Sequence, residues 1–236
     1  MGLVITPTHP DADSYVSLSE ATSYLANRTG ITDWSALTSD QKETALKIAT
    51  KQIDSFRYRD LKMYDVAMDY RLEQALQFPR NTHPTNTAVV QTASTLAVSI
   101  GVSDAINQPN DYWNNGAVIV VSGTGRGQIR LISDFNADTG VITISEAWTT
   151  IPDTTSQLRL VKEILKDIKY ATIEQALYLS KGGGERARLQ SEGVTSYTIG
   201  DLSETFGGAV SNKNIKLSIE AQAYLNKYIS RIGRFC

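Results

Sequence analysis

Side chains that could carry nucleophilic, acid–base or metal chemistry are scarce in this 236-residue chain. The two histidines, His9 and His83, each stand beside a proline in a polar stretch, and the single cysteine is the last residue, Cys236. These residues cannot supply the cluster of His and Cys ligands that a zinc site needs. No serine near either histidine lies in a Gly-x-Ser-x-Gly sequence. We therefore expect no catalytic residue, no metal and no cofactor, and a protein that is not an enzyme.

A glycine-rich stretch offers a second kind of chemistry, the binding of phosphate. The sequence Gly123-Thr-Gly-Arg-Gly127 superficially resembles a phosphate-binding loop, but such loops open directly into a helix whose N–H groups face the phosphate. Here the sequence QIRLIS follows, which is typical of a strand. The stretch therefore predicts a hairpin turn. The glycines at 182–184 follow a helical pattern and indicate a helix end.

A mixture of aromatic and basic residues offers a third kind of chemistry, the binding of nucleic-acid bases. Such a mixture could stack on single-stranded bases, or it could form helix packing or a subunit contact, since interfaces also favour Tyr and Arg. The residues concerned are Tyr58, Tyr64, Tyr70 and Phe78 with Arg57, Arg59, Arg71 and Arg80. The second interpretation is favoured from the sequence, and the first stays open.

The elements that must position these residues begin as helices. Ser17–Glu20 forms a capping box that opens a helix to about Asn27, and Thr38–Gln41 begins an amphipathic helix of about eighteen residues. A third helical piece is predicted over Tyr70–Gln77 and ends before Pro79, because a residue that precedes proline is pushed out of the helical region.

The pattern then changes to short strands. Residues 81–161 contain no lysine, three arginines and six acids, and they are rich in Thr, Val, Ile and Gly. A turn is predicted at Asp138–Gly140, the helical period returns at Val161, and residues 194–208 alternate as a short strand pair or an extended arm would. We therefore predict an α+β fold. A small α-helical bundle core, residues 1–80 and 161–236, is interrupted by an inserted all-β domain, residues 81–160.

Charge and hydropathy limit the class of partner. The formal net charge is −2, which argues against a dedicated duplex-DNA-binding protein that neutralises phosphates. No run approaches eighteen apolar residues, so we expect no membrane partner.

Several phrases, taken in order, resemble the head-to-tail connector (adaptor, head completion) proteins of tailed bacteriophages, a group sometimes labelled DnaT-like single-stranded-DNA-binding. The similar phrases are the opening from Tyr15 through the helix that ends near Tyr58, the phrase EQALQFPR, the helix ILKDIKYATIEQALYLS and the Gly-Asp-x-Ser element. The motif residues are Gln74, Ala75, Leu76, Phe78, Pro79, Arg80, Gly200, Asp201 and Ser203.

The resemblance implies a structural virion protein. Members of that family form a ring, commonly of twelve copies, beneath the portal protein, extend the DNA channel and provide the platform for a tail or neck protein. The implied partners are the portal protein, the tail or neck protein, further copies of the chain, and double-stranded DNA that passes through the ring without sequence recognition. The implied location is the head–tail junction of a virion whose proteins are made in the host cytoplasm.

The basic and aromatic C-terminal tail is a candidate contact with the portal or a neighbouring subunit. Its residues are Arg231, Ile232, Arg234 and Phe235. Two other functions remain open at this point. One is a single-stranded-DNA-binding replication module, and the other, weaker alternative is an adaptor with cell-wall hydrolase activity.

Overall fold

The computed structural model describes residues 2–64, 73–101, 108–182, 196–199, 202–205 and 217–230. Contacts within the chain divide it into two compact units. Unit 1 contains Met1–Tyr15 and Tyr58–Lys166, and unit 2 contains Val16–Arg57 and Asp167–Phe235. A division by contacts does not test which segments fold on their own, so the predicted domain boundaries stay a prediction.

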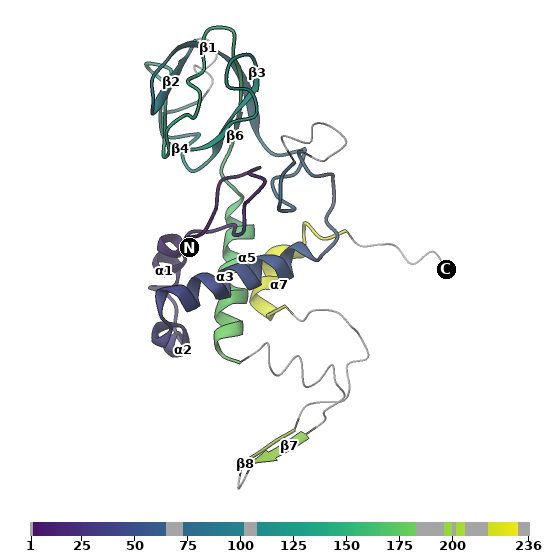
Figure 1. Ribbon diagram of the computed structural model, residues 1–236. Helices are drawn as coiled ribbons and strands as arrows, with labels where there is room; N and C mark the ends of the chain where they lie inside the picture. The colour runs from purple at the N-terminus through teal and green to yellow at the C-terminus, as the bar shows by residue number, and fades with distance from the viewer. Residues whose placement is uncertain are drawn as a thin grey trace, which may run out of the picture. The chain divides into compact units, whose positions relative to one another are not determined.

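Unit 1 is built on a closed antiparallel barrel of six strands in the order β1-β2-β5-β4-β3-β6, which Figure 1 shows as a cylinder. The strands are β1 (Thr85–Ala93), β2 (Ala97–Ile100), β3 (Ala117–Ser122), β4 (Ile129–Asn136), β5 (Val141–Ile144) and β6 (Gln157–Val161). The first and last strands close the barrel, because Thr85 pairs with Val161 and Val89 with Gln157. Closure leaves no strand edge unpaired.

The inward faces of the strands form the largest apolar cluster of the described residues. Trp113 and Trp148 pack there with Phe135 and with the alternate Val, Ile and Leu side chains of all six strands. Register shifts interrupt three of the pairings, between Val90 and Thr92, between Val120 and Ser122, and between Ile132 and Asp134. Bulges of this kind increase strand bending, which a small closed barrel requires.

The connections of the barrel follow local turn chemistry. The glycine-rich stretch 123–127 joins β3 to β4, and Asp138–Gly140 lies in the turn between β4 and β5, as the sequence predicts. A second apolar cluster lies on the outer side of β3, where Met63 and Tyr64 cover Ala117 and Ile119. Strand β3 is therefore buried on both faces, which explains its continuous apolar sequence AVIVV.

Unit 2 is helical. Its elements are α1 (Leu18–Leu25), α2 (Thr32–Ala36), α3 (Ser39–Asp54), α5 (Lys166–Ser180) and α7 (Ile219–Leu225), with a two-stranded sheet of β7 (Ser196–Ile199) and β8 (Leu202–Thr205). The capping boxes of α1 and α3 are present as predicted, with Ser17 and Glu20 in the first and Thr38 and Gln41 in the second. The predicted strand pair is confirmed as β7 and β8.

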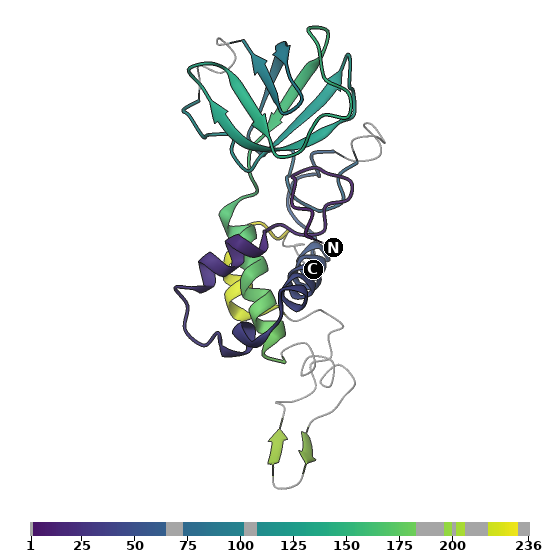
Figure 2. The ribbon, with the colours of Figure 1, turned by 60° about the vertical axis from the view of Figure 1, so that its left-hand side comes forward.

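Helix α5 lies at the centre of unit 2, with α1, α3 and α7 around it (Figure 2). It is buried on nearly every side, including the side chains of Lys169, Glu174 and Gln175. The Glu174 carboxylate accepts hydrogen bonds from Tyr24 Oη at 2.7 Å and from Arg28 Nη2 at 2.8 Å. The Gln175 side chain bonds to Gln52 of α3. These polar partners allow the charged and amide groups to be buried.

Two predictions about the fold are wrong. The first is the fold class, a small α-helical bundle core with an inserted all-β module, because a closed six-stranded barrel holds the largest apolar cluster. The second is the helix over Tyr70–Gln77, because Glu73–Gln77 form no helix; residues 70–72 lie outside the described residues. In addition, the helix predicted from Val161 begins at Lys166, since Val161 pairs in β6 with Thr85.

Candidate functional site

Two segments of unit 1 that precede the barrel, residues 58–64 and 73–82, run side by side. Lys62 and Arg80 form an antiparallel bridge. Met63 N donates to Pro79 O at 3.2 Å, and Asn81 N donates to Leu61 O at 2.9 Å. The pairing fixes residues 59–62 as a short turn, in which Arg59, Asp60 and Leu61 are exposed and Lys62 is half-buried.

Gln74 holds the two segments together. Its side chain is 1% exposed. Gln74 Oε1 accepts from Tyr64 N at 3.1 Å, and Gln74 Nε2 donates to Leu76 O at 2.8 Å and to Pro79 O at 3.0 Å. An amide is the side chain that supplies both an acceptor and two donors at one point. The backbone N–H groups of Gln74 and Ala75 donate to Tyr64 O at 3.4 Å and to His9 O at 3.3 Å. A helix over Tyr70–Gln77 would use these two groups, so their bonds elsewhere are consistent with the absence of a helix over Glu73–Gln77.

Arg80 and Phe78 complete the connection. The Arg80 guanidinium donates to Arg59 O at 3.1 Å, to Asp60 O, and to Gln77 O at 3.0 Å. Phe78 is buried, its N–H donates to Tyr15 Oη at 3.1 Å, and its ring contacts Tyr15 edge-on. The motif Gln74, Phe78, Pro79 and Arg80 therefore acts as structural support of unit 1. Of its other members, Ala75 is exposed and Leu76 half-buried.

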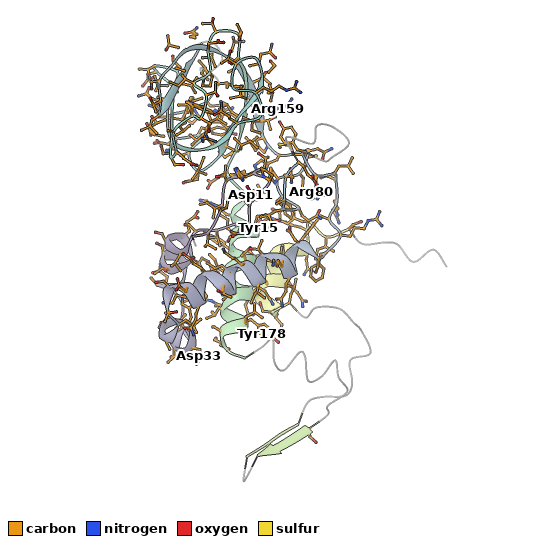
Figure 3. All side chains as sticks on the ribbon, viewed as in Figure 1. Asp11, Tyr15, Asp33, Arg80, Arg159 and Tyr178 are labelled. Carbon is orange, nitrogen blue, oxygen red and sulfur yellow. The ribbon has the colours of Figure 1, made fainter. Side chains whose placement is uncertain are left out.

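Four cations lie on these segments and on the adjoining outer face of the barrel. We call these four residues the basic surface: Arg59, Lys62, Arg80 and Arg159. Arg159 alternates with the fully buried Leu158 and Leu160 of β6, so its side chain leaves the barrel on the outside. Figure 3 shows Arg159 on the barrel and Arg80 on the segment that precedes it.

Contacts connect Arg159 to the turn. Arg159 Nη1 donates to Tyr64 Oη at 3.0 Å, and the guanidinium carbon lies 5.6 Å from the centre of the Tyr64 ring. Lys62 Nζ donates to Gln74 O and Ala75 O, each at 3.3 Å. Among the described residues, no hydrogen bond or ion pair of the Arg59 side chain is found, and that residue is exposed. Arg59 is thus the member of the surface most available to an anion.

The acids of the same segments are Asp60 and Glu73. Asp60 Oδ2 accepts from Thr82 Oγ1 at 3.2 Å, and Glu73 is exposed. On the two segments, three cations, Arg59, Lys62 and Arg80, stand against these two acids, which is a positive balance on a chain whose net charge is −2. The arrangement can bind an anion by charge. It brings together no residues that could carry acid–base or nucleophilic catalysis.

The aromatic residues suggested for base stacking are not exposed. Tyr58, Tyr64 and Phe78 are 5%, 4% and 3% exposed, and Tyr58 packs edge-on against Phe78. Burial raises the pKa of Tyr64, although Arg159 opposes this effect. The rings are therefore part of the core of unit 1, where they pack in non-helical segments and not between helices. Tyr70 and Arg71 lie outside the described residues.

The two histidines lie in loops of unit 1. His83 is buried, its Nε2 donates to Lys162 O at 2.9 Å, and its pKa is lowered chiefly by burial. His9 Nδ1 accepts from Asp11 N at 3.1 Å, and burial also lowers its pKa. Within the described ranges, no group of three or more His, Cys, Asp or Glu side chains is placed to hold a metal ion.

The candidate contact residues of the C-terminal tail stay a prediction. Arg231, Ile232, Arg234 and Phe235, together with Gly200 and Asp201, lie outside the described residues, whereas Ser203 lies in β8. In the part of the chain that the structure describes, no helix has the length and hydropathy to cross a membrane.

Sequence reasoning singled out Arg59 and Arg80 but missed Lys62 and Arg159. The signal for Arg159 was present, because it is the single charged residue in the strand sequence QLRLV. A charge in a strand of otherwise apolar residues identifies the outer face of a barrel, because its core side holds apolar side chains. The signal for Lys62 was its spacing from Arg59 in the sequence RDLK.

No curated protein and no solved structure matches this chain. One family model matches residues 1–120, and its description is "Putative DnaT-like ssDNA binding protein".

This finding overturns the prediction of a phage head-to-tail adaptor, which is wrong, and with it the description as a neck protein in a twelve-membered ring. Nothing supports the portal and tail proteins as partners. The expectations that the chain is not an enzyme and that it is made in a host cytoplasm stay predictions. Because the match covers 120 of the 236 residues, more than half, the chain belongs to the DnaT-like single-stranded-DNA-binding family.

Proposed function

We propose that this protein binds single-stranded DNA through the basic surface of unit 1. The observation that carries the proposal is membership of the DnaT-like family, whose model covers residues 1–120. Three of the four cations, Arg59, Lys62 and Arg80, lie within that range. The alternative that the sequence left open thus replaces the adaptor, and DNA is retained as a partner in single-stranded form.

The geometry supports a single strand better than a duplex. Proteins that bind single strands combine cations that follow the backbone with apolar groups that contact bases, often on small β-barrels. A duplex presents a stiff, densely charged rod, which is usually met by a strongly basic face or a helix in the major groove. Unit 1 offers a short exposed turn beside a barrel and a modest positive balance, which a flexible strand can follow.

The test is a titration of the full-length protein with a fluorescently labelled oligothymidine at several salt concentrations. We expect binding that weakens as salt rises, since each phosphate contact adds about 0.7 to the slope of log affinity against log salt. Arg59→Ala should reduce that slope by roughly 0.7 and weaken binding. The matched control is Lys51→Ala, which removes one exposed charge from α3 of unit 2 and should leave binding unchanged.

Two results would contradict the proposal. One is the absence of any binding to oligothymidine at low salt. The other is equal losses for Arg59→Ala and Lys51→Ala, which would assign the binding to the overall charge of the chain and not to the basic surface.

A further inference from the structure

Leu61 is the most exposed large apolar side chain described in unit 1, at 72%. A single exposed leucine needs no explanation by itself. Its position is unusual, however, because it lies in the turn of residues 59–62, between Arg59 and Lys62 of the basic surface.

The turn holds Leu61 in place. Leu61 O accepts from Asn81 N at 2.9 Å, and the Arg80 guanidinium donates to the carbonyl oxygens of Arg59 and Asp60. Asp60, whose φ is 63°, also bonds to Thr82 through its carboxylate. An apolar side chain on a backbone fixed in this way loses little conformational freedom when a ligand covers it.

Among the described residues of the two segments, no other large apolar side chain is exposed. The rings of Tyr58, Tyr64 and Phe78 are nearly completely buried. Leu61 is therefore the group of the turn that remains available to a base. Arg59 and Lys62 are three residues apart, so their Cα atoms are separated by at most about 11 Å, a span that one or two nucleotides of an extended strand can cover.

We propose that Leu61 packs against the face of an unstacked nucleobase, while the neighbouring phosphates pair with Arg59 and Lys62. This inference rests on the proposed function and names the contact that favours a single strand over a duplex. A base in a duplex is stacked on both faces, so an apolar wedge must first separate it from a neighbour and lose that stacking. A base in a single strand is exposed at little cost.

The test uses an oligothymidine that carries one 2-aminopurine, whose fluorescence rises when the base leaves its stack, and the same sequence as a duplex. We expect the full-length protein to raise the fluorescence of the single strand. Leu61→Ser should remove most of this rise and weaken single-strand binding about 3- to 10-fold, less than the loss of a stacked aromatic residue. Its salt slope should stay unchanged, because the cations remain.

Two variants serve as controls. Leu96→Ser changes an exposed leucine, 49% exposed, in the turn between β1 and β2, where no charged residue is adjacent, and it should bind like the unchanged protein. Leu61→Met keeps an apolar side chain and should keep both the affinity and the fluorescence rise.

The outcomes separate the two proposals. If the protein binds single strands with the expected salt slope but Leu61→Ser binds equally well, the role of Leu61 is wrong and the proposed function stands. If Leu61→Met loses as much as Leu61→Ser, the role of Leu61 is also wrong. If the protein binds no single strand, both proposals fail. If sedimentation shows an oligomer that Leu61→Ser dissociates without a change in DNA affinity, Leu61 contacts another copy of the chain instead.

Discussion

Among single residues, Gln74 has the largest predicted effect on the turn that carries the basic surface. Gln74→Ala leaves the Tyr64 N–H and the Leu76 carbonyl without the bonds that Gln74 supplies, and Pro79 O keeps only its bond from Met63 N. Each buried group left unpaired costs about 1–3 kcal/mol. Because some of these groups can reach water after the change, we expect the free energy of unfolding of unit 1 to fall by about 2–4 kcal/mol. Urea denaturation followed by tryptophan fluorescence measures this loss, since Trp113 and Trp148 lie in unit 1.

A control variant distinguishes the loss of stability caused by removing Gln74 from that caused by removing an exposed glutamine. Gln91 is exposed on β1, so Gln91→Ala should change the free energy of unfolding by less than about 0.5 kcal/mol. Equal effects of the two substitutions would show that the Gln74 bonds contribute nothing. The sequence identified Gln74 as a motif residue, but it could not reveal its role, because the partners of an amide are fixed only when Tyr64 and Pro79 meet in space.

At the scale of the element, the hairpin between β3 and β4 depends on Gly123. Its φ is 78°, and a Cβ atom at this position would collide with the backbone of Thr155 and lie 2.6 Å from Ser156 Cα. Gly182, at the end of α5, has a φ of 75°, but a Cβ atom there meets nothing within 4 Å. We therefore expect Gly182→Ala to cost about 1–2 kcal/mol, the penalty of the left-handed backbone alone, and Gly123→Ala to cost clearly more.

Chemical denaturation measures the free energy of unfolding of both variants. The difference between their losses is the cost of the collision alone, because both variants carry the backbone penalty. Hydrogen exchange of β3 and of α5 assigns each loss to its own unit. A Gly123→Ala variant no less stable than Gly182→Ala would mean that the loop containing Thr155 moves away freely.

The elements divide into those that local sequence determines and those that it does not. The capping boxes of α1 and α3 involve residues three apart, and the glycine-rich turn is read from its own residues, so both were predicted correctly. Closure of the barrel depends on the pairing of Thr85 with Val161, which are far apart in the chain. The sequence therefore indicates strands but not a closed barrel. The helical period of the flanking segments predicts a helical main core, and this prediction is wrong.

At the scale of the whole molecule, the sequence predicts residues 1–80 as one part of a helical core. Contacts group Val16–Arg57 with unit 2, whereas Met1–Tyr15 and the chain from Tyr58 are grouped with the barrel in unit 1. The deciding contacts, Phe78 against Tyr15 and Met63 against β3, join distant parts of the chain and leave no periodic signal. For the same reason, the sequence could name aromatic and basic residues but could not tell that the aromatic rings are buried while Leu61 is exposed.

The division of the chain into two units predicts that the stability of unit 1 alone responds to pH near neutrality. The chain has two histidines, and both His9 and His83 lie in unit 1. Burial is the main reason why the pKa of each is below its usual value of 6.5. The unfolded chain therefore takes up protons first as pH falls. Stability is fully present above pH 6.5 and decreases as pH falls from there toward the folded pKa values, by at most about 1.4 kcal/mol per histidine and pH unit.

Hydrogen exchange at pH 7.5 and pH 5.5, corrected for the intrinsic pH dependence of exchange, can resolve the two units. We expect protection of β3 in unit 1 to fall at the lower pH while protection of α5 in unit 2 changes little, because carboxylates with ordinary pKa values titrate below this window. His83→Gln should reduce the pH response of β3, with the remainder due to His9. An equal loss of protection in α5 would show that the two units unfold together, because the histidines of unit 1 would then destabilise the whole chain.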